Sequence, residues 1–335
     1  MKIGEFETSD RVLIIAEIGN NHEGDRGRAE AMIAAAAEAG ADAVKFQTIV
    51  PERLVHPSET ARLAQLGRLC LSYEDFGRLA EAASRCGVLF LSTPFDLDSV
   101  RFLEPLVPGY KIASGDNDFV PLLEAVARTT KPVILSTGLL GISEVVRSKA
   151  CIERVWAQTG KAGALALLHC VSAYPTPPEE ANLGAIRDLA GLGCTVGYSD
   201  HTIGIEAAVL SVGLGGRIIE KHFTLDKNLS DFRDHKLSAD PADLKTLVRR
   251  VREAETMIGS AGKQPMASES ASGASVRRSI VAGRDLAAGH VLAFEDLNWL
   301  RPGGGMEPGR EGEILGRTLR KGISAGDRLT AEAFE

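Results

Sequence analysis

The sequence predicts an α/β protein in which a (β/α)₈ barrel is followed by a small β-rich domain. Two observations support this prediction. Short apolar, β-prone runs alternate with amphipathic helical stretches through the first 259 residues, and there are eight such runs. The composition then changes abruptly after residue 259. A doubly wound open sheet is the alternative, because the number of strands does not show that the sheet closes.

The predicted strands share a short length and a high content of aliphatic residues. In chain order they are 12–19, 42–48, 88–95, 110–115, 132–138, 165–172, 195–200 and 217–223. Helical segments lie between them, among them 28–40, 73–87 and 205–216, and several end at a glycine suited to a helix C-terminus. This spacing of strand and helix favours the barrel over the open sheet.

The end of the chain is organised differently. After a long helical stretch at 241–259, residues 260–275 are poor in bulky apolar residues and rich in Ser, Ala and Gly, which is typical of a linker. Residues 276–335 contain short strands and Gly-rich turns. The sequence therefore predicts a barrel domain over 1–259, a linker over 260–275 and a β-rich domain over 276–335.

Composition and charge narrow the possible functions. The 335 residues are 44% hydrophobic and 25% charged, which is ordinary for a globular protein. The net charge of −7 leaves no overall basic surface for nucleic acid or anionic lipid, so an anionic ligand must meet local positive charge. Five scattered cysteines without a C-x-x-C pair, and no signal peptide or membrane span near the N-terminus, lead us to expect a reduced, cytoplasmic protein.

Polar residues recur at the carboxyl ends of the predicted strands, where a barrel of this class builds its site. They are Glu17, Lys45, Gln47, Thr93, Lys111, Ser114, Ser136, Ser172, Tyr174, Ser199, His201, Glu220 and His222. A single hydroxyl at such a position usually caps the strand end. A lysine inside an apolar run, however, is rarely buried without a partner. Lys45 and Lys111, with hydroxyls from several strands, predict a site for a small dianionic molecule that carries phosphate or carboxylate.

Two further pairs of residues suggest chemistry. His201 and His222 end consecutive strands, so both imidazoles can reach one divalent ion if the barrel closes in this order. The alternative is that both histidines are structural. Glu17 and Glu220 can serve as acid or base, and the alternative for them is an ion pair with the nearby lysines.

Eight sequence blocks, in order, resemble those of the sialic acid synthase family. They are IIAEIGNNHEGD, AVKFQT, LSTPF, YKIASGD, VILSTG, LLHCVSAYPTP, GYSDHT and IIEKHFTLDKN. The later segment SIVAGRDLAAGHVLAFEDLNWLRPGGG is similar to the family's C-terminal antifreeze-like (SAF) domain. The resemblance covers almost the whole chain. It implies a transferase that condenses phosphoenolpyruvate with an N-acyl amino sugar to give a nonulosonic acid and phosphate, for surface polysaccharide biosynthesis.

The resemblance also implies roles for individual residues. Glu17, Lys45, Lys111 and Glu220 would be catalytic, and His201 and His222 would hold a divalent ion, Mn²⁺ in preference to Mg²⁺ or Co²⁺. Phosphoenolpyruvate would contact both lysines together with Thr93, Ser114, Asp116, Ser136, Ser172 and Ser199, although position 172 is commonly Asn in the family. Gln47, Tyr174 and Asp234 would surround the sugar. Arg301 would reach from one subunit into the other subunit's barrel, in a domain-swapped homodimer.

The chain departs from the family pattern around the sugar. The loop after the eighth strand reads SDFRDHKLSADP, with Phe232 and Arg233 before Asp234, where many members have Gly-Pro-Asp. The loop after the second strand, PERLVHPSETARLAQLGRLC, lacks an asparagine that members tend to offer. The acceptor therefore stays open between N-acetylmannosamine and a 2,4-diacetamido-trideoxyhexose. Two rival functions are a related phosphoenolpyruvate-condensing synthase or metal-dependent aldolase, and a non-catalytic sugar- or ice-binding protein.

Overall fold

The computed structural model describes residues 1–161, 163–259 and 262–334. The chain forms two compact units, Met1–Gly259 and Ser260–Glu335, and each is described by itself. Within the described ranges, no helix is both long enough and apolar enough to cross a membrane.

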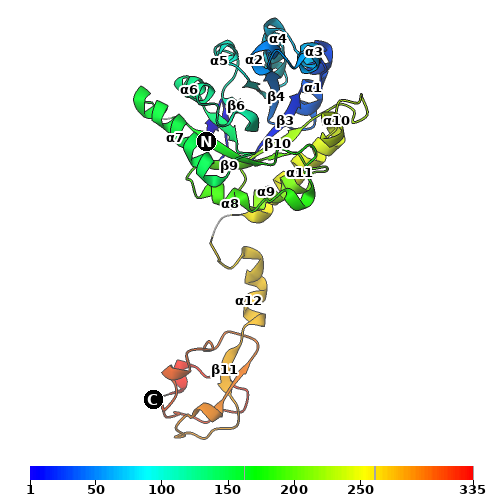
Figure 1. Ribbon diagram of the computed structural model, residues 1–335. Helices are drawn as coiled ribbons and strands as arrows, with labels where there is room; N and C mark the ends of the chain where they lie inside the picture. The colour runs from blue at the N-terminus through cyan, green and yellow to red at the C-terminus, as the bar shows by residue number, and fades with distance from the viewer. Residues whose placement is uncertain (162, 260–261, 335) are drawn as a thin grey trace. The chain divides into compact units, whose positions relative to one another are not determined.

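The first unit is a barrel of eight parallel strands surrounded by helices (Figure 1). The strands are β3 (Leu13–Gly19), β4 (Ala43–Thr48), β5 (Leu89–Pro94), β6 (Tyr110–Ile112), β7 (Val133–Ser136), β8 (Leu165–Cys170), β9 (Thr195–Asp200) and β10 (Ile218–His222). The hydrogen-bonded order is β5-β4-β3-β10-β9-β8-β7-β6, and β5 and β6 at its two ends are also in contact. The predicted barrel is confirmed, because β3 pairs with β10 and no strand order reverses as it would in an open doubly wound sheet.

The helices follow the strands as expected for βα units. The main ones are α1 (Arg26–Glu38), α4 (Tyr73–Arg85), α5 (Leu97–Leu103), α6 (Val120–Arg128), α7 (Ile142–Thr159), α8 (Ala185–Ala190), α9 (Glu206–Gly213) and α11 (Pro241–Ile258). Side chains cap several of their N-termini: Asp25 caps α1, and Ser72 forms a capping box with Asp75 at α4. Short helices α2 (Pro51–Leu54), α3 (Thr60–Leu69) and α10 (Asp234–Leu237) lie in the loops after β4 and β10.

The barrel strands alternate between two apolar layers, and this alternation positions the site. Residues such as Ile14 and Ala16 point outward into the core beneath the helices, whereas Leu13 and Ile15 point into the barrel. A hairpin of β1 (Lys2–Ile3) and β2 (Phe6–Glu7) packs on the inward residues, and we did not predict it because its strands have only two residues each. The next inward residue of β3 after Ile15 is Glu17, so the apolar filling gives way to polar side chains toward the carboxyl ends.

The second unit is built mainly from turns around a small core. Its sheet pairs β11 (Ser279–Ala282) with β12 (Leu297–Leu300) antiparallel, and Ile280, Leu329 and Phe334 are among its buried residues. The segment that we predicted as a linker, 260–275, contains η3 (Ala267–Glu269) and most of α12 (Ser270–Val276). The predicted linker is therefore partly helical.

Candidate active site

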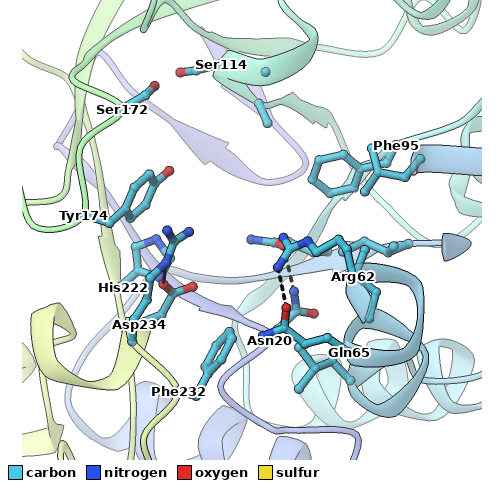
Figure 2. Close-up of a pocket in the computed structure, with 18 of the residues that line it drawn as sticks. Asn20, Arg62, Gln65, Phe95, Ser114, Ser172, Tyr174, His222, Phe232 and Asp234 are labelled. Carbon is cyan, nitrogen blue, oxygen red and sulfur yellow. Dashed lines mark hydrogen bonds and ion pairs between the residues drawn. The ribbon is translucent and has the colours of Figure 1, made fainter. Parts of the chain in front are cut away.

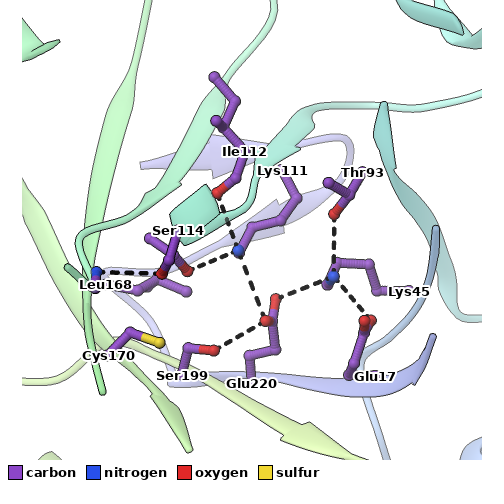
Figure 3. A network of polar contacts seen from close by, with 12 residues as sticks. Glu17, Lys45, Thr93, Lys111, Ile112, Ser114, Leu168, Cys170, Ser199 and Glu220 are labelled. Atoms are coloured by element: carbon purple, nitrogen blue, oxygen red, sulfur yellow. Dashed lines mark hydrogen bonds and ion pairs between the residues drawn. The ribbon is translucent and has the colours of Figure 1, made fainter. Parts of the chain in front are cut away.

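Four buried charged side chains meet at the carboxyl ends of the barrel strands (Figure 3). Lys45 Nζ lies 2.8 Å from Glu17 Oε2 and 3.8 Å from Glu220 Oε2. Lys111 Nζ lies 3.7 Å from Glu220 Oε1. All four come from inward positions of β3, β4, β6 and β10, so the period-two pattern of the strands brings them together. The ion pairing considered as the alternative role of the two glutamates is therefore present, and it is compatible with a catalytic role.

Hydroxyl groups surround these four charged side chains, which we call the charged layer. Lys45 Nζ donates to Thr93 Oγ1 over 3.1 Å, and Lys111 Nζ donates to Ser136 Oγ over 2.7 Å. Ser199 Oγ donates to Glu220 Oε1 over 3.0 Å. The structure thus brings three of the predicted hydroxyls to the lysines and Glu220, where they can exchange these contacts for those of an anionic ligand.

The two carboxyl groups differ in acidity although both are fully enclosed. Burial raises the pKa of Glu17, and the charge of Lys45 offsets this only in part. Burial also opposes ionisation of Glu220, but the charges of Lys111 and Lys45 and the Ser199 hydrogen bond lower its pKa to about 2. A pair of carboxyls whose environments shift them in opposite directions is typical of a site that does acid–base work. The surroundings thus favour the ionised form of Glu220 and the protonated form of Glu17.

A small cradle lies beside the layer, between Ser114, Ser172 and Gly138. A Cβ atom at position 138 would lie 2.5 Å from Ser172 Oγ and 2.6 Å from Ser114 Oγ. Ser172 Oγ is buried and has no hydrogen-bond partner in the described part of the chain. Asn117 Nδ2 holds the loop by donating to Gly138 O over 2.8 Å. The cradle exists because residue 138 has no side chain, and its unused hydroxyl fits an oxygen-rich ligand.

The two predicted metal ligands are close to one another. The ring centroids of His201 and His222 are 5.5 Å apart, and the ring centroids of Tyr174 and His201 are 4.2 Å apart. His201 Nδ1 is 2.8 Å from Val171 O, and because a carbonyl only accepts, Nδ1 carries the proton and Nε2 keeps its lone pair. Nδ1 of His222 is buried, and it has no hydrogen-bond partner among the described residues. Within the described ranges no group of three or more His, Cys, Asp or Glu side chains is placed to hold a metal.

A cavity of about 600 Å³ opens above these groups (Figure 2). It connects to the charged layer through Gln47, whose Nε2 donates to Glu17 Oε1 over 3.0 Å and whose Oε1 accepts from Asn20 Nδ2 over 3.0 Å. Its polar lining residues are Asn20, Gln47, Arg62, Gln65, Ser114, Ser172, Tyr174, His222, Asp231, Arg233 and Asp234. Its apolar lining residues are Ile49, Leu54, Leu66, Leu69, Phe95, Ala113, Leu139 and Phe232. The cavity has the size and mixed lining of a small-molecule site.

The loop before α10 forms one wall of the cavity. The guanidinium carbon of Arg233 lies 4.9 Å from the centre of the Tyr174 ring, and Arg233 Nε donates to Asp234 Oδ1 over 3.1 Å. These contacts place the residues that replace the Gly-Pro-Asp of many family members directly at the cavity. The loop after the second strand, the other segment that we expected to depart from the family pattern, also contributes to the lining.

Comparison with known proteins identifies the chain. Residues 32–263 match the NeuB family, and residues 277–335 match the SAF domain. The chain belongs to the NeuB family. It is 42% identical to an N,N'-diacetyllegionaminic acid synthase of Legionella pneumophila, over 96% of this chain and 94% of that protein. It is 36% identical to a pseudaminic acid synthase of Campylobacter jejuni, over the full length of both. The fold is also similar to the crystal structure of an N-acetylneuraminic acid (sialic acid) synthetase from Leptospira borgpetersenii in complex with citrate. The two structures superpose with a TM-score of 0.76 at 35% sequence identity, and the match covers 81% of this chain and 94% of that chain.

Some side chains of this NeuB-family barrel were missed in the sequence. Arg62 and Gln65 border the site, and neither was predicted to do so. Asn20 and Gly138 lie at predicted strand ends but were given no role there. Gly138 had a usable signal, because it follows Ser136 and Thr137 at a strand end. Arg62 and Gln65 had none, because they lie on a short helix inside a loop whose path the strand pattern does not determine.

Two residues predicted to bind substrate are not among the residues that line the cavity. Asp116, in the turn η1 (Ser114–Asp116), does not line the cavity, although its neighbours Ser114 and Gly115 do. Arg301 belongs to the second unit, directly after β12. Their roles stay predictions.

The partly buried carboxyl of Asp116 should affect how the free energy of unfolding depends on pH. Burial, with a smaller effect of Asp118, raises the pKa of Asp116 to about 6. A folded-state pKa above the unfolded value means that the ionised group opposes folding at neutral pH, and that this cost disappears as the pH falls below the unfolded value. We expect Asp116→Asn to increase the free energy of unfolding by about 1 kcal/mol at pH 7.5, after allowance for solvent screening, and by roughly half of that or less at pH 4, where the folded carboxyl is largely protonated. Urea unfolding at both pH values tests this, and an equal effect at both would contradict it.

Proposed function

We propose that this chain is a nonulosonic acid synthase, which condenses phosphoenolpyruvate with an N-acyl amino sugar and releases phosphate. The observation that carries the proposal is the charged layer: Lys45 and Lys111, both buried, converge with hydroxyls and the open cradle at Gly138 beneath a sugar-sized cavity. This arrangement suits a ligand with a phosphate and a carboxylate. The legionaminic and pseudaminic acid synthases among the relatives support the same reaction.

Each group then has a defined task. Lys45 and Lys111 bind the phosphate and carboxylate of phosphoenolpyruvate, with Ser114 and Ser172 around the cradle. C3 of phosphoenolpyruvate forms the new bond to the aldehyde carbon of the sugar, water adds at C2, and the C2–O bond to phosphate breaks. Glu17, whose pKa is raised by burial, moves a proton to or from the new hydroxyl or the attacking water. Glu220 stays ionised and keeps both lysines charged and in place.

The relatives guide the choice of acceptor. Both curated relatives named above carry the names of synthases of diacylamino nonulosonic acids, and their identity extends over nearly the whole chain. We therefore propose a 2,4-diacetamido-trideoxyhexose as the preferred acceptor, ahead of N-acetylmannosamine. The product would be a precursor for surface polysaccharide. A cytoplasmic location and a domain-swapped homodimer, with Arg301 of one subunit at the other subunit's site, are part of the proposal.

A divalent ion fits the two histidines. His201 Nε2 has a free lone pair because its Nδ1 proton is used on Val171 O, and Nδ1 of His222 is buried without a partner. An ion held there would supply Lewis-acid chemistry at the sugar aldehyde. Because the protein offers two ligands, water and substrate oxygens would complete the shell, and Mn²⁺ is our proposed ion, with Mg²⁺ and Co²⁺ as substitutes.

The histidine pair provides a direct test of this proposal. We expect His201→Ala and His222→Ala each to weaken Mn²⁺ binding by more than about 10-fold. Replacing a residue that only hydrogen-bonds to a metal ligand already lowers metal affinity by about this factor. Mn²⁺ affinity is measured by paramagnetic resonance, and phosphate release from phosphoenolpyruvate is measured with a panel of N-acetylated hexosamines and their 6-deoxy diamino analogues. The matched control is His56→Ala, in the loop after β4. Unchanged Mn²⁺ affinity in both variants would contradict the metal assignment.

A further inference from the structure

The wall of the cavity formed by α3 contains an arginine that no known role explains. Arg62 and Gln65 of α3 line the cavity together with Leu66 and Leu69 of the same helix. Figure 2 shows Arg62 and Gln65 on the opposite side of the cavity from Tyr174 and His222. The aldehyde of an acceptor must lie near the histidines in the proposed reaction, so α3 faces the other end of the sugar.

The guanidinium of Arg62 retains hydrogen-bonding capacity. Its Nη1 donates to the neutral amide oxygen of Gln65 over 2.8 Å, and within the described part of the chain it forms no ion pair. Arg233 on the opposite wall differs, because Asp234 neutralises it and Tyr174 lies beneath it. A guanidinium has five N–H donors. Arg62 thus presents several donors and an uncompensated positive charge to whatever occupies this end of the cavity.

The surroundings of Arg62 indicate the kind of group that it binds. The polar side chains that Figure 2 labels beside Arg62 are Asn20 and Gln65, which are neutral amides, and Asn20 donates to a third amide, Gln47. Leu66 of α3 and Phe95 add apolar side chains to the lining. The cavity also contains the carboxylates of Asp231 and Asp234, which oppose a phosphate dianion. A group with a carbonyl oxygen and a methyl matches one guanidinium beside apolar side chains better than a phosphate does.

Given the proposed function, we infer that Arg62 is a specificity residue that binds the acylamido group at the end of the acceptor remote from the aldehyde. Its guanidinium donates to the acyl carbonyl oxygen, Gln65 orients the guanidinium, and the acyl methyl packs on the apolar wall. A 2,4-diacetamido-trideoxyhexose has such a group at C4. N-acetylmannosamine has its only acylamido group at C2, next to the aldehyde, and cannot make this contact.

The test compares Arg62→Met with the matched control Arg68→Met, which removes an exposed arginine of the same helix that does not line the cavity. Steady-state kinetics are measured with phosphoenolpyruvate, Mn²⁺ and three acceptors: the diacetamido sugar, N-acetylmannosamine and its 6-phosphate. For the diacetamido sugar we expect Arg62→Met to raise KM by about 10- to 100-fold, as for loss of one hydrogen bond to a charged group. In Arg62→Met, KM for phosphoenolpyruvate and kcat/KM for N-acetylmannosamine should change by less than about 3-fold. In Arg68→Met, every kinetic parameter should stay within the same limit.

Each other outcome has a definite meaning. An equal loss with the diacetamido sugar and N-acetylmannosamine, or an unchanged KM for the former, would overturn the inference while the synthase function stands. The unmodified protein could instead prefer the 6-phosphate, with this preference lost in Arg62→Met. That result would show that Arg62 binds a phosphate and not an acylamido group, and it would overturn the inference as well. If the unmodified protein released phosphate with none of the three sugars, the proposed function would fail, and the inference with it.

Discussion

Replacing Glu17 by Gln is expected to reduce kcat by about 10²- to 10⁴-fold, the usual contribution of a general acid or base. Of Glu17 and Glu220, only Glu17 has a net raised pKa, because burial outweighs the charge of Lys45, so it is the carboxyl that holds a proton more tightly than usual. Gln has the same shape and keeps an oxygen that can accept from Gln47 Nε2. Lys45 keeps its contacts with Glu220 and Thr93. KM for phosphoenolpyruvate should therefore change by less than about 3-fold.

The measurement is steady-state phosphate release as a function of pH. The unmodified protein should show a limb in the kcat profile above the ordinary range of a carboxyl pKa, and Glu17→Gln should lack it. Glu81→Gln is the matched control, because Glu81 is exposed on α4 and its closest cation, Arg85, is 4.0 Å away. Losses of equal size in kcat and in phosphoenolpyruvate affinity would show that Glu17 serves binding and would refute its role in proton transfer.

Replacing Gly138 by Ala is expected to raise KM for phosphoenolpyruvate by at least about 10²-fold, the effect of misplacing a reactant by roughly 1 Å. The added methyl would lie 2.5 Å from Ser172 Oγ and 2.6 Å from Ser114 Oγ, which is inside contact distance. It must push these hydroxyls apart or occupy the space between them. Residue 138 does not need a left-handed backbone, so the change affects the cradle and not the path of the chain.

A second glycine serves as the control for this substitution. A Cβ at Gly77, in the middle of α4, would meet no atom within 4 Å. Gly77→Ala should stabilise the protein by about 0.5–1 kcal/mol through helix propensity and leave the kinetics unchanged. Isothermal titration of phosphoenolpyruvate into each variant separates binding from turnover. Normal phosphoenolpyruvate affinity in Gly138→Ala would show that the cradle is not the phosphate or carboxylate site.

The site residues that could be predicted from the sequence are those whose side chains belong to barrel strands. Lys45 and Glu17 occupy inward positions of β4 and β3, and a period of two residues combined with barrel closure brings them within 2.8 Å. The family resemblance correctly indicated the barrel and the SAF domain. The acceptor end of the cavity was not predictable from the same pattern. Arg62 lies on α3 in a long connection between β4 and α4, and its place depends on how that loop packs.

Other differences have similar physical causes. The hairpin of β1 and β2 fills the amino end of the barrel with Ile3 and Phe6, but two-residue strands leave no periodic signal. The segment 260–275 looked like a linker because Ser, Ala and Gly dominate it, yet Ala and Ser also tolerate the helical turns seen there. Composition alone does not separate these two states in a short segment.

In the proposed reaction, the chain makes a carbon–carbon bond between phosphoenolpyruvate and an amino sugar. The most direct test incubates the protein with Mn²⁺, phosphoenolpyruvate and the 2,4-diacetamido-trideoxyhexose and quantifies phosphate and the nine-carbon product in the same sample by phosphorus NMR and mass spectrometry. We expect equal molar amounts of phosphate and nonulosonic acid, both absent without sugar and both strongly reduced in Glu17→Gln. Phosphate without the nine-carbon product, or consumption of free pyruvate in place of phosphoenolpyruvate, would contradict the claim.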